Sequence, residues 1–592
     1  MNISDFFCLC KRIFSLSEKG TILDSIEYKW LMESVRSVSL RFAEETGLIF
    51  KEEEMDFPHY TKTPEHILKT VFGYDSFRHM QKQVIQNVLS GRDTLAVMPT
   101  GGGKSLCYQI PALLGSGLTV VVSPLIALMQ DQVQQLEALG VPAVYLNSSL
   151  EWPQYKICCD RIRKGEIKLL YVSPEGLNTE RIRSILHNAS VKVDCITIDE
   201  AHCLSEWGHD FRPDYLEIEK ARKEFPKAVF LALTATATRQ VQSDIVKNLD
   251  MDNPDILVAS FNRPNIFLGV ERKVDPIQQV YDFIEDHLDE SGIIYCFSRK
   301  QVDEVAEKLQ RKGLNVLNYH AGLSDAVRAR NQKAFIQDKA DIMVATVAFG
   351  MGINKPDVRW VIHYDMPKSI EQYYQEIGRA GRDGLPSEAL LLYSPSDIRK
   401  IRYFFNEAAD SSKAEKLLQG MIRYAESTQC RRKTMLSYFG ENLSPDAEKE
   451  NKECCCDLCI IENSVQKPQV RLIKAADRAG QTKPAEQSSG FKSFPKPTRD
   501  KTSKISGRPQ KRIEMDETSQ LIADELKKWR KKAAEELKVP PYVIFGDRTM
   551  MDIAEKKPMS ERQLLNCYGI GESKAEKFGY FILRIVKENN IG

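Results

Sequence analysis

Short apolar runs alternate with amphipathic stretches in two parts of the chain. In the first part, which ends near residue 258, the runs are Leu95–Met98, Leu118–Val122, Leu169–Val172, Val193–Ile198 and Val229–Leu233. In the second part, from about residue 265 to residue 394, they are Gly292–Phe297, Leu314–Tyr319, Ile342–Ala345, Trp360–Tyr364 and Ala389–Tyr393. Stretches with helical periodicity, such as Leu106–Leu114 and Leu128–Leu139, separate the runs. Because strands that alternate with helices form parallel sheets, the pattern predicts two tandem α/β domains with helices on both faces of each sheet.

Changes in this pattern divide the chain further. The segments are an amphipathic helical extension at 1–60, the two α/β domains at 61–262 and 263–400, a helical module with clustered cysteines at 401–460, a polar linker at 461–513 and a helical domain at 514–592. The linker is rich in Lys, Pro, Ser, Gln and Gly, and its basic residues outnumber its acidic ones. Such a composition buries too little apolar surface to fold, so we predict a disordered tether with weak affinity for phosphates.

The composition narrows the class of protein. Hydrophobic residues make up 42% of the 592 residues and charged residues 28%, as in an ordinary globular protein. The formal net charge is only +1, so a nucleic-acid surface has to be a local patch. No apolar stretch is long enough to cross a bilayer, and the first residues lack the apolar core of a signal peptide. We therefore expect a protein of a reducing compartment without membrane partners.

The segment between the first apolar run and the first helix has the residues of a phosphate-binding loop. It reads Met98-Pro-Thr-Gly-Gly-Gly-Lys-Ser105. Backbone N–H groups at the helix N-terminus can face an anion, Lys104 can reach the outer phosphates, and the Ser105 hydroxyl can hold Mg²⁺. The strict pattern requires glycine where this chain has Met98, yet every group that the mechanism needs is present. The expected ATP contacts are Thr100, Gly101, Gly102, Gly103, Lys104 and Ser105.

A second candidate for chemistry closes the apolar run that ends at Ile198. Asp199 and Glu200 follow this run directly, and His202 comes two residues later. Beside bound ATP, Asp199 can hold Mg²⁺ through water and Glu200 can accept a proton from the attacking water. His202 is placed to connect the nucleotide with neighbouring loops, so we include it with the catalytic candidates.

A short helical stretch ahead of the phosphate loop offers groups for a nucleotide base. Gln81 has the paired donor and acceptor that can bond an adenine edge. Tyr74 offers a ring for stacking, and Arg78 offers a cation beside the base. We therefore predict that these three side chains bind adenine.

An aromatic and polar segment follows the acidic pair. Its candidates for DNA contact are Trp207, His209, Phe211 and Arg212. Aromatic faces stack on unpaired bases for about 1–3 kcal/mol each, and arginine adds charge attraction. A loop attached to the Mg²⁺-binding strand would couple base contact to hydrolysis.

Two other strand ends carry small polar turns, at Ser123 and Ser173. Their hydroxyl and N–H groups can contact a phosphodiester backbone. An ordinary turn explains each of them equally well, so both interpretations stay open.

The second α/β domain lacks a phosphate loop but carries two closely spaced arginines. Arg379 and Arg382 lie in Gln375-Glu-Ile-Gly-Arg-Ala-Gly-Arg-Asp-Gly384. A spacing of three predicts that both lie on one face of a helix. On a domain without its own nucleotide, they are expected to reach the γ-phosphate bound by the first domain, a contact worth about 10³–10⁵ in rate.

The motifs together resemble those of the RecQ family of superfamily-2 DNA helicases, over roughly residues 64 to 460 and again near the C-terminus. The strings that carry the resemblance are Phe72-Gly-Tyr with Phe77-Arg78 and Gln81, Met98 to Ser105, Asp199 to Pro213, Ala345 to Pro356 and Gln375 to Gly384. Met98 is usual in this family. The resemblance implies two tandem RecA-like, doubly wound parallel-sheet domains, followed by a small zinc-binding helical module and a small all-α domain.

The resemblance also implies an activity: ATP-dependent unwinding of duplex DNA in repair and recombination, with 3′ to 5′ movement on single-stranded DNA. By resemblance Gln81 reads adenine, Glu200 is the base, and Arg379 and Arg382 supply the finger function. In the Ala345–Pro356 string we assign Gly350 to the nucleotide and Thr346 to DNA. The expected cofactors are ATP, Mg²⁺ and Zn²⁺.

The resemblance extends to partners and location. Beyond single-stranded and duplex DNA, we expect single-strand-binding protein and a topoisomerase as partners of a monomeric protein. The expected location is the bacterial nucleoid in the cytoplasm, or the nucleus if the source is eukaryotic. Many members carry a winged-helix domain after the zinc site. Residues 461–513 are too few and too polar for one, so we expect no wedge mechanism based on that domain.

The clustered cysteines are Cys454, Cys455, Cys456 and Cys459. In a chain of enzyme size without a signal peptide, such a cluster indicates metal rather than disulfides. A structural Zn²⁺ takes four tetrahedral ligands, and Cys430, Cys456 and Cys459 supply three of them. Relatives with adjacent cysteines point to Cys455 as the fourth ligand, and Cys454 remains the alternative.

The C-terminal segment resembles an HRDC domain, an accessory module that often binds single-stranded DNA. Its Gly569-Ile-Gly571 turn can place N–H groups on a phosphate, or it can simply support packing between helices. The sequence does not separate these two interpretations.

Two other functions compete with a DNA helicase. One is a structural nucleic-acid binder with a decayed motor, against which the presence of Lys104, Asp199, Glu200 and both arginines argues. The other is an RNA helicase, because phosphate contacts alone do not distinguish the two nucleic acids.

Overall fold

The computed structural model describes residues 63–590, except 79, 208–210, 351–354, 406–410, 443–454, 465–514 and 538. All of them belong to one of the two units into which the chain divides, residues 62–592. The predicted N-terminal extension at 1–60 and nearly all of the predicted linker lie outside the described residues. So do Cys454 and His209.

The first sheet has seven parallel strands in the order β3-β4-β2-β5-β6-β1-β7. They are β1 (Thr94–Val97), β2 (Leu118–Val122), β3 (Ala143–Leu146), β4 (Leu169–Val172), β5 (Val193–Ile198), β6 (Val229–Thr234) and β7 (Asp255–Val258). Along β1, Leu95 and Val97 join one apolar cluster, whereas Ala96 joins another. Alternate side chains of a strand point to opposite faces, so both faces of this sheet are packed.

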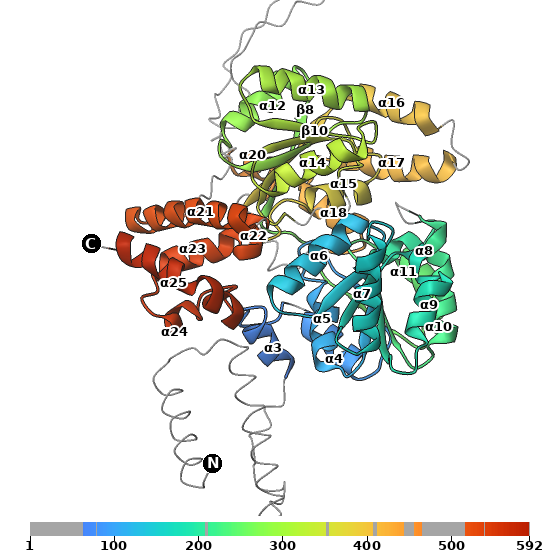
Figure 1. Cartoon of the computed structure of the whole chain (residues 1–592). Coiled ribbons are helices and arrows are strands. Elements are labelled where there is room, and N and C mark those ends of the chain that lie inside the picture. The colour runs from blue at the N-terminus through green and yellow to red at the C-terminus, as the bar shows by residue number, and fades with distance from the viewer. Residues whose placement is uncertain are drawn as a thin grey trace, which may run out of the picture. The chain divides into compact units, whose positions relative to one another are not determined.

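Helices cover both faces of the first sheet (Figure 1). They are α3 (Pro64–Thr70), α4 (Gln81–Leu89), α5 (Leu106–Leu114), α6 (Ile126–Ala138), α7 (Trp152–Arg163), α8 (Pro174–Leu177), α9 (Glu180–Leu186), α10 (Glu219–Glu224) and α11 (Arg239–Asn248), with two short 3-10 helices, η1 (Ala201–Leu204) and η2 (Pro213–Ile218). Hydroxyl caps begin several of them: the side chains of Thr63, Thr179 and Thr238 each accept a hydrogen bond from the first turn. Residues next to each of these helices therefore help to determine where it begins within the strand–helix alternation.

The second sheet has six parallel strands in the order β10-β11-β9-β12-β13-β8. They are β8 (Ile266–Arg272), β9 (Ser291–Tyr295), β10 (Val316–Tyr319), β11 (Ile342–Ala345), β12 (Val358–His363) and β13 (Ser387–Tyr393). Its helices are α12 (Pro276–Glu285), α13 (Arg299–Arg311), α14 (Asp325–Ile336) and α15 (Ile370–Ile377). The prediction of two tandem parallel-sheet domains is confirmed.

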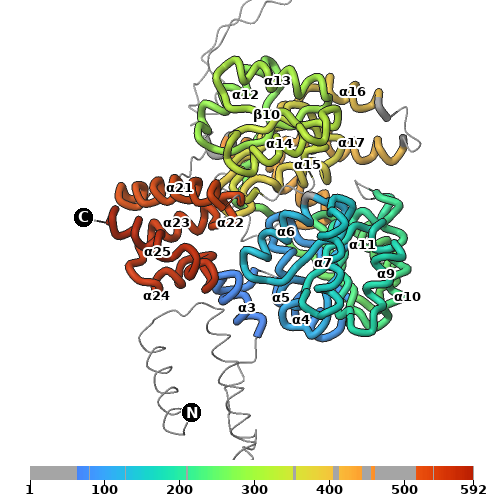
Figure 2. Tube along the Cα trace, viewed as in Figure 1, coloured from blue at the N-terminus to red at the C-terminus, as the bar shows by residue number. Residues whose placement is uncertain are grey.

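The cysteine module continues from the second sheet (Figure 2). Its helices are α16 (Pro395–Phe405), α17 (Ser411–Ala425), α18 (Arg431–Tyr438) and α20 (Asp457–Ser464). Cys456 pairs with Leu268 of the edge strand β8 in an isolated parallel bridge. Arg431 and Asp457 form a buried ion pair with a 3.0 Å contact, which ties α18 to α20. The module thus packs directly on the edge of the second sheet.

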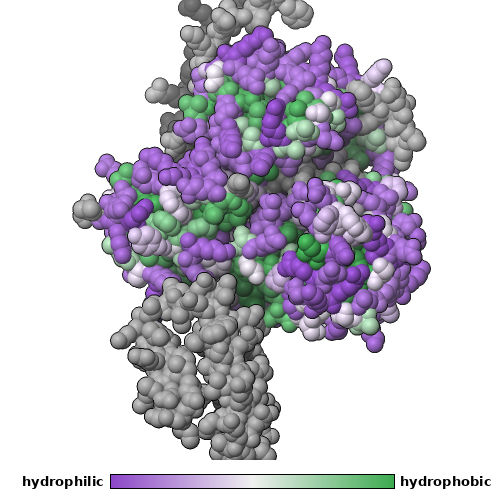
Figure 3. Space-filling model, in the orientation of Figure 1, coloured by the Kyte–Doolittle hydropathy of each residue, from purple (hydrophilic) through white to green (hydrophobic). Residues whose placement is uncertain are grey.

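The C-terminal module is entirely helical, as predicted, within its described residues. It contains α21 (Glu517–Leu537), α22 (Pro541–Ile544), α23 (Asp547–Lys556), α24 (Glu561–Leu564) and α25 (Glu572–Asn589). Its helices enclose an apolar cluster of their own, which includes Leu526, Phe545 and Ile582. Hydrophilic residues cover most of the described surface in the view of Figure 3. Among the described helices, none combines the length and the apolar character that a membrane span needs.

Candidate active site

The phosphate loop connects the end of β1 with the start of α5. Within it, Lys104 Nζ donates a hydrogen bond to the backbone oxygen of Met98 at 3.2 Å. Burial lowers the pKa of Lys104, and the carboxylates of Glu200 and Asp199 oppose that shift. The lysine is therefore folded into the loop next to the acidic pair, as a cation that holds phosphate should be.

The acidic pair lies where β5 ends. Burial, and then the charge of Glu200, raise the pKa of Asp199 to about 7, whereas Lys104 opposes the shift. Glu200 has a left-handed backbone conformation with φ of +50°, which is rare outside glycine and is typically found at functional sites. Within the described part of the chain, Glu200 Oε2 is buried and accepts no hydrogen bond. Apart from the His202 ring, whose Nδ1 lies 3.4 Å away, no described residue therefore competes for a proton on this oxygen.

His202 joins the acidic pair to the neighbouring strand. Its Nδ1 lies 2.9 Å from Thr234 Oγ1 at the end of β6 and 3.4 Å from Glu200 Oε2. Burial is the largest cause that lowers the pKa of His202, to about 3, and the nearby cations Lys104 and Arg212 act in the same direction. The imidazole is consequently neutral at pH 7, so it can orient Glu200 but does not serve as a cationic acid.

The prediction that Arg379 and Arg382 share one face of a helix is wrong. Helix α15 ends at Ile377, and residues 378–383 form consecutive turns. Gly381 has φ of +57°, a left-handed conformation that a right-handed helix cannot continue. The spacing of three residues therefore does not align the two side chains.

The two arginines instead face different neighbours. Arg382 approaches the phosphate loop, since a Cβ added to Gly101 would lie 3.2 Å from the Arg382 Cα. Burial lowers the pKa of Arg382 to about 9, and the charge of Arg379 adds to the shift. Arg379 is nearly buried and lies beside Gly350, where a Cβ would come within 2.9 Å of its Nη2. The structure thus brings Arg382 to the phosphate loop and Arg379 to Gly350.

Gln81 does not present a free amide. Its Oε1 accepts a hydrogen bond from the Arg78 backbone N–H at 2.7 Å, and its Nε2 donates to Gly103 O at 3.0 Å and to Gly102 O at 3.4 Å. The Arg78 guanidinium also donates to Gly101 O. The two side chains are therefore bound to the phosphate loop, and their contact with adenine stays a prediction.

Tyr74 contacts a residue that the sequence did not single out. The rings of Tyr74 and Tyr568 lie 5.2 Å apart between centroids, and the Arg78 Nη2 lies 3.4 Å from the Tyr568 hydroxyl. Next to this pair, the Gly569 backbone N–H donates to Gly73 O at 2.9 Å. The Gly569–Gly571 turn therefore packs on the Gly73 turn. No local pattern could indicate a contact between segments so far apart in the sequence.

We expect the Tyr568→Ala variant to bind ATP more tightly than the parent. Tyr568 contacts both Tyr74 and Arg78, the two groups predicted to enclose adenine, so its ring would compete with the base for them. An aromatic pair is worth about 0.5–1.5 kcal/mol, which corresponds to a fall in KM for ATP of up to about tenfold. Steady-state ATPase measurements test this. Tyr580→Ala, which removes an exposed ring of α25, is the matched control. A KM that rises instead would mean that Tyr568 supports the nucleotide.

The aromatic segment after η1 presents one large exposed ring. Trp207 is 50% exposed, and Lys413 Nζ lies over its ring at 4.9 Å from the centroid. Phe211 and Arg212 are partly buried, and Arg212 Nη1 donates to the Pro124 backbone oxygen at 3.3 Å. Trp207 is thus available for stacking, while Arg212 supports the loop from beneath.

The small polar candidates are less accessible. Ser123 is 1% exposed, and its hydroxyl has no hydrogen-bond partner among the described residues. The Ser173 hydroxyl accepts a hydrogen bond from Gly176 N–H at 3.1 Å and so caps α8. Thr346 is partly buried after β11. Contact between their side chains and a DNA backbone stays a prediction for all three.

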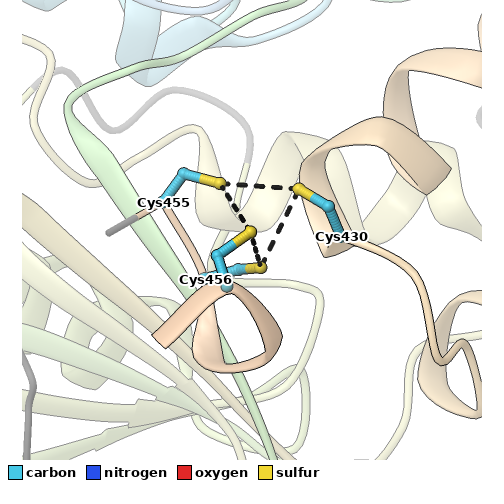
Figure 4. Close-up of side chains that lie close together, drawn as sticks. Cys430, Cys455 and Cys456 are labelled. Carbon is cyan, nitrogen blue, oxygen red and sulfur yellow. Dashed lines mark hydrogen bonds between the residues drawn. The ribbon is translucent and has the colours of Figure 1, made fainter. Parts of the chain in front are cut away.

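Four cysteines converge where α18 and α20 begin, beside β8. Figure 4 shows three of them, Cys430, Cys455 and Cys456, with their side chains turned toward one another. The sulfur atoms of Cys430, Cys455, Cys456 and Cys459 all lie within 4.8 Å of one another, and neighbouring pairs are separated by 3.5 to 3.9 Å. A tetrahedral zinc with bonds of about 2.3 Å requires sulfur–sulfur distances of about 3.8 Å. The donor set therefore fits Zn²⁺ in both number and chemistry.

The fold and this site define a class of protein: a two-sheet nucleotide-hydrolysing motor of the helicase type. Family models match the chain in the same order, as a DEAD/DEAH box helicase at residues 78–244 and a helicase conserved C-terminal domain at 273–384. A RecQ zinc-binding model matches residues 395–460, and an HRDC domain model matches 519–586.

Full-length relatives agree with these models. The chain is 38% identical over 599 residues to the ATP-dependent DNA helicase RecQ of Haemophilus influenzae, a match that covers 88% of this chain and 95% of the relative. It is 35% identical over 584 residues to the protein of the same name from Bacillus subtilis (strain 168), with 88% and 98% covered. The chain belongs to the RecQ family of helicases.

Proposed function

We propose that this protein is an ATP-dependent DNA helicase that moves 3′ to 5′ along single-stranded DNA and unwinds duplex DNA in repair and recombination. The observation that carries the proposal is the group of charged side chains at the phosphate loop. The charges of Asp199, Glu200 and Arg382 act on the pKa of Lys104, and the charge of Glu200 acts on that of Arg382, so these groups lie close together as an ATP-hydrolysing site requires. The names of the relatives, which specify DNA as the nucleic acid, support the choice of substrate.

Each residue of the site has a role in this proposal. Lys104 holds the outer phosphates, and Glu200 orients the attacking water and accepts its proton, while the neutral His202 fixes the direction of the carboxylate. Ser105 and Asp199 would hold Mg²⁺, which when bound neutralises charge on the phosphates. Arg382 meets the γ-phosphate as the two sheets close on the nucleotide, and Arg379 supports it from beside Gly350.

DNA contact is coupled to hydrolysis through the aromatic segment. This segment follows η1 directly, so a base that stacks on Trp207 shifts the loop attached to the acidic pair. We assign Phe211, Arg212 and His209 to the same strand, and Ser123, Ser173 and Thr346 to its phosphates. We further propose a monomer that acts at the nucleoid or in the nucleus, with single-strand-binding protein and a topoisomerase as partners.

Single-stranded DNA should stimulate ATP hydrolysis by this protein, and Trp207→Ala should weaken that stimulation. Stacking contributes about 1–3 kcal/mol per base, so the DNA concentration for half-maximal stimulation should rise by roughly 5- to 150-fold. Trp152→Ala is the matched control, because Trp152 is also exposed but stacks on Tyr155 at α7. ATPase titrations with an oligonucleotide measure the effect.

The outcomes separate the candidate functions. ATP hydrolysis without any response to DNA would contradict the helicase proposal. No hydrolysis at all would indicate the structural nucleic-acid binder. Equal stimulation by DNA and RNA strands of the same length, at one stated salt concentration, would favour the RNA helicase.

A further inference from the structure

Arg263 lies in the segment that connects the two sheets, between the end of β7 and the start of β8. Its guanidinium donates to Thr100 O at 2.6 Å, in the phosphate loop. It also donates to Ala380 O and Gly381 O, both at 3.0 Å, and reaches Gly378 O at 3.4 Å. One side chain therefore hydrogen-bonds to the phosphate loop and to the turn that carries Arg379 and Arg382.

The environment of this guanidinium is unusual for a buried cation. Among the described residues, no carboxylate forms an ion pair with Arg263, and its partners are backbone carbonyl oxygens together with the side chain of Asn265. Burial lowers the pKa of Arg263, but an arginine side chain stays charged. Burying a charge that only carbonyl dipoles compensate costs folding free energy, so stability alone does not explain this arrangement. The planar fork of donors does, however, fix several carbonyl groups at once.

The rest of the segment keeps this fork in place. Asn265 Nδ2 donates to Gly381 O and Leu385 O, both at 2.9 Å, so it binds the same turn. From α18, Arg432 donates to Arg263 O at 2.6 Å and to Ile266 O at 2.7 Å. We call residues 378–383, which carry Arg379 and Arg382, the arginine turn. The cysteine module therefore holds the backbone of Arg263, while the side chain of Arg263 holds the arginine turn.

We propose that Arg263 is a positioning residue for ATP hydrolysis, which sets the arginine turn at the correct distance from the phosphate loop. The bonds to Ala380 and Gly381 stay within the second sheet and its turns, whereas the bond to Thr100 joins the two sheets. Because the bond to Thr100 spans the two sheets, its formation would couple the approach of the sheets to the placement of Arg382. The proposal rests on the proposed ATPase function.

The test compares Arg263→Lys and Arg263→Gln with the parent and with Arg382→Ala. An ammonium reaches fewer carbonyls than a guanidinium, so the arginine turn loses its alignment in Arg263→Lys. A misplacement of about 1 Å costs on the order of 10²-fold in rate. We therefore expect kcat with saturating DNA to fall about 10²-fold in both variants, while KM for ATP changes less than about threefold.

A second measurement distinguishes positioning from general damage. The affinity for a non-hydrolysable ATP analogue should match that of the parent, whereas the affinity for ADP with aluminium fluoride, which mimics the transition state, should fall as in Arg382→Ala. Arg222→Lys is the matched control, because Arg222 is a partly buried arginine that is bound to Asp93, just before β1, and not to the turn. Asn265→Ala, which removes a weaker hold on Gly381 without changing a charge, should show the same selective loss at about a tenth of the size.

Three results would overturn the proposal. The first is a kcat within about threefold of the parent in both Arg263 variants. The second is an equal loss of affinity for the ATP analogue and for the transition-state mimic. The third is a fall in the thermal midpoint that accounts for the lost activity in every variant, including Asn265→Ala. If the parent itself shows no DNA-stimulated hydrolysis, it is the proposed function that fails.

Discussion

The Lys104→Ala variant should lose ATP hydrolysis by about 10³-fold or more, while it still binds single-stranded DNA. Lys104 is the buried cation of the phosphate loop, and both carboxylates of the acidic pair act on its ionisation. Removing it leaves the transferred phosphoryl group without its cation at the moment when negative charge moves toward the leaving group. DNA binding depends on other surfaces, so a fluorescence anisotropy titration should give a dissociation constant close to that of the parent.

The control for this variant is Lys82→Ala. Lys82 also lies near the start of the site, on α4, but it is exposed and forms an ion pair with Glu65 at 2.8 Å. Such surface pairs contribute little, so its turnover should stay near that of the parent. Measurable turnover in Lys104→Ala, above a tenth of the parental rate, would show that the phosphate loop is wrongly assigned.

Sequence periodicity was sufficient for the strands that lie inside the sheets. β2, β4, β5 and β11 have the predicted bounds, because interior strands of a parallel sheet are buried on both faces and read as continuous apolar runs. The edge strands β3, β7 and β8 were missed. In β7, Ile256 and Val258 are exposed, so the strand lacks a continuous buried run. The bounds predicted for α5 match those observed, because the helix is itself an apolar run and follows directly on a strand and a glycine turn.

The same distinction holds for the site. The phosphate loop and the acidic pair are local, so their roles could be read from adjacent residues. The turn after α15 could not, because a spacing of three predicts a shared helical face only while the helix continues, and α15 ends at Ile377, before both arginines. Contacts between distant segments could not be predicted from the sequence for a different reason. Arg263 and Thr100 are 163 residues apart, and Tyr568 and Arg78 are 490 apart. No pattern along the chain records such pairs.

Long-range hydrogen bonds connect the nucleotide site to more distant parts of the fold. Glu200 is oriented by His202, which in turn hydrogen-bonds to Thr234 at the end of β6. On the opposite side, the segment at Arg263 joins the arginine turn to the cysteine module through Arg432. Arg432 also donates to Cys455 O, so hydrogen bonds connect the cysteine cluster to the phosphate loop through Arg432 and Arg263. We therefore expect damage at the zinc site to impair the nucleotide site.

For that reason, Cys456→Ser should both remove zinc and unfold the cysteine module at residues 395–464. Cys456 is fully buried and forms a bridge with Leu268 of β8. Arg432 binds the segment just before β8 through Arg263 O. Structural zinc contributes about 10–16 kcal/mol of apparent binding free energy in small zinc domains, which is about as large as the whole stability of a typical domain. We expect zinc content to fall from one per chain to near zero, and limited proteolysis to cleave within 395–464. ATP turnover should fall with it.

Cys158→Ser is the matched control, because Cys158 is a partly buried thiol of α7 outside the cluster. It should keep one zinc per chain and the parental protease resistance. If Cys456→Ser is too unstable to purify, the parent answers the same question: a chelator should remove zinc and protease resistance at one common rate, since the metal holds α18 and α20 together. Full zinc content and full protease resistance in Cys456→Ser would show that Cys456 is not a ligand. Protease resistance that survives complete removal of zinc would show that the metal does not hold the module, whose buried Arg431–Asp457 ion pair would then have to be sufficient.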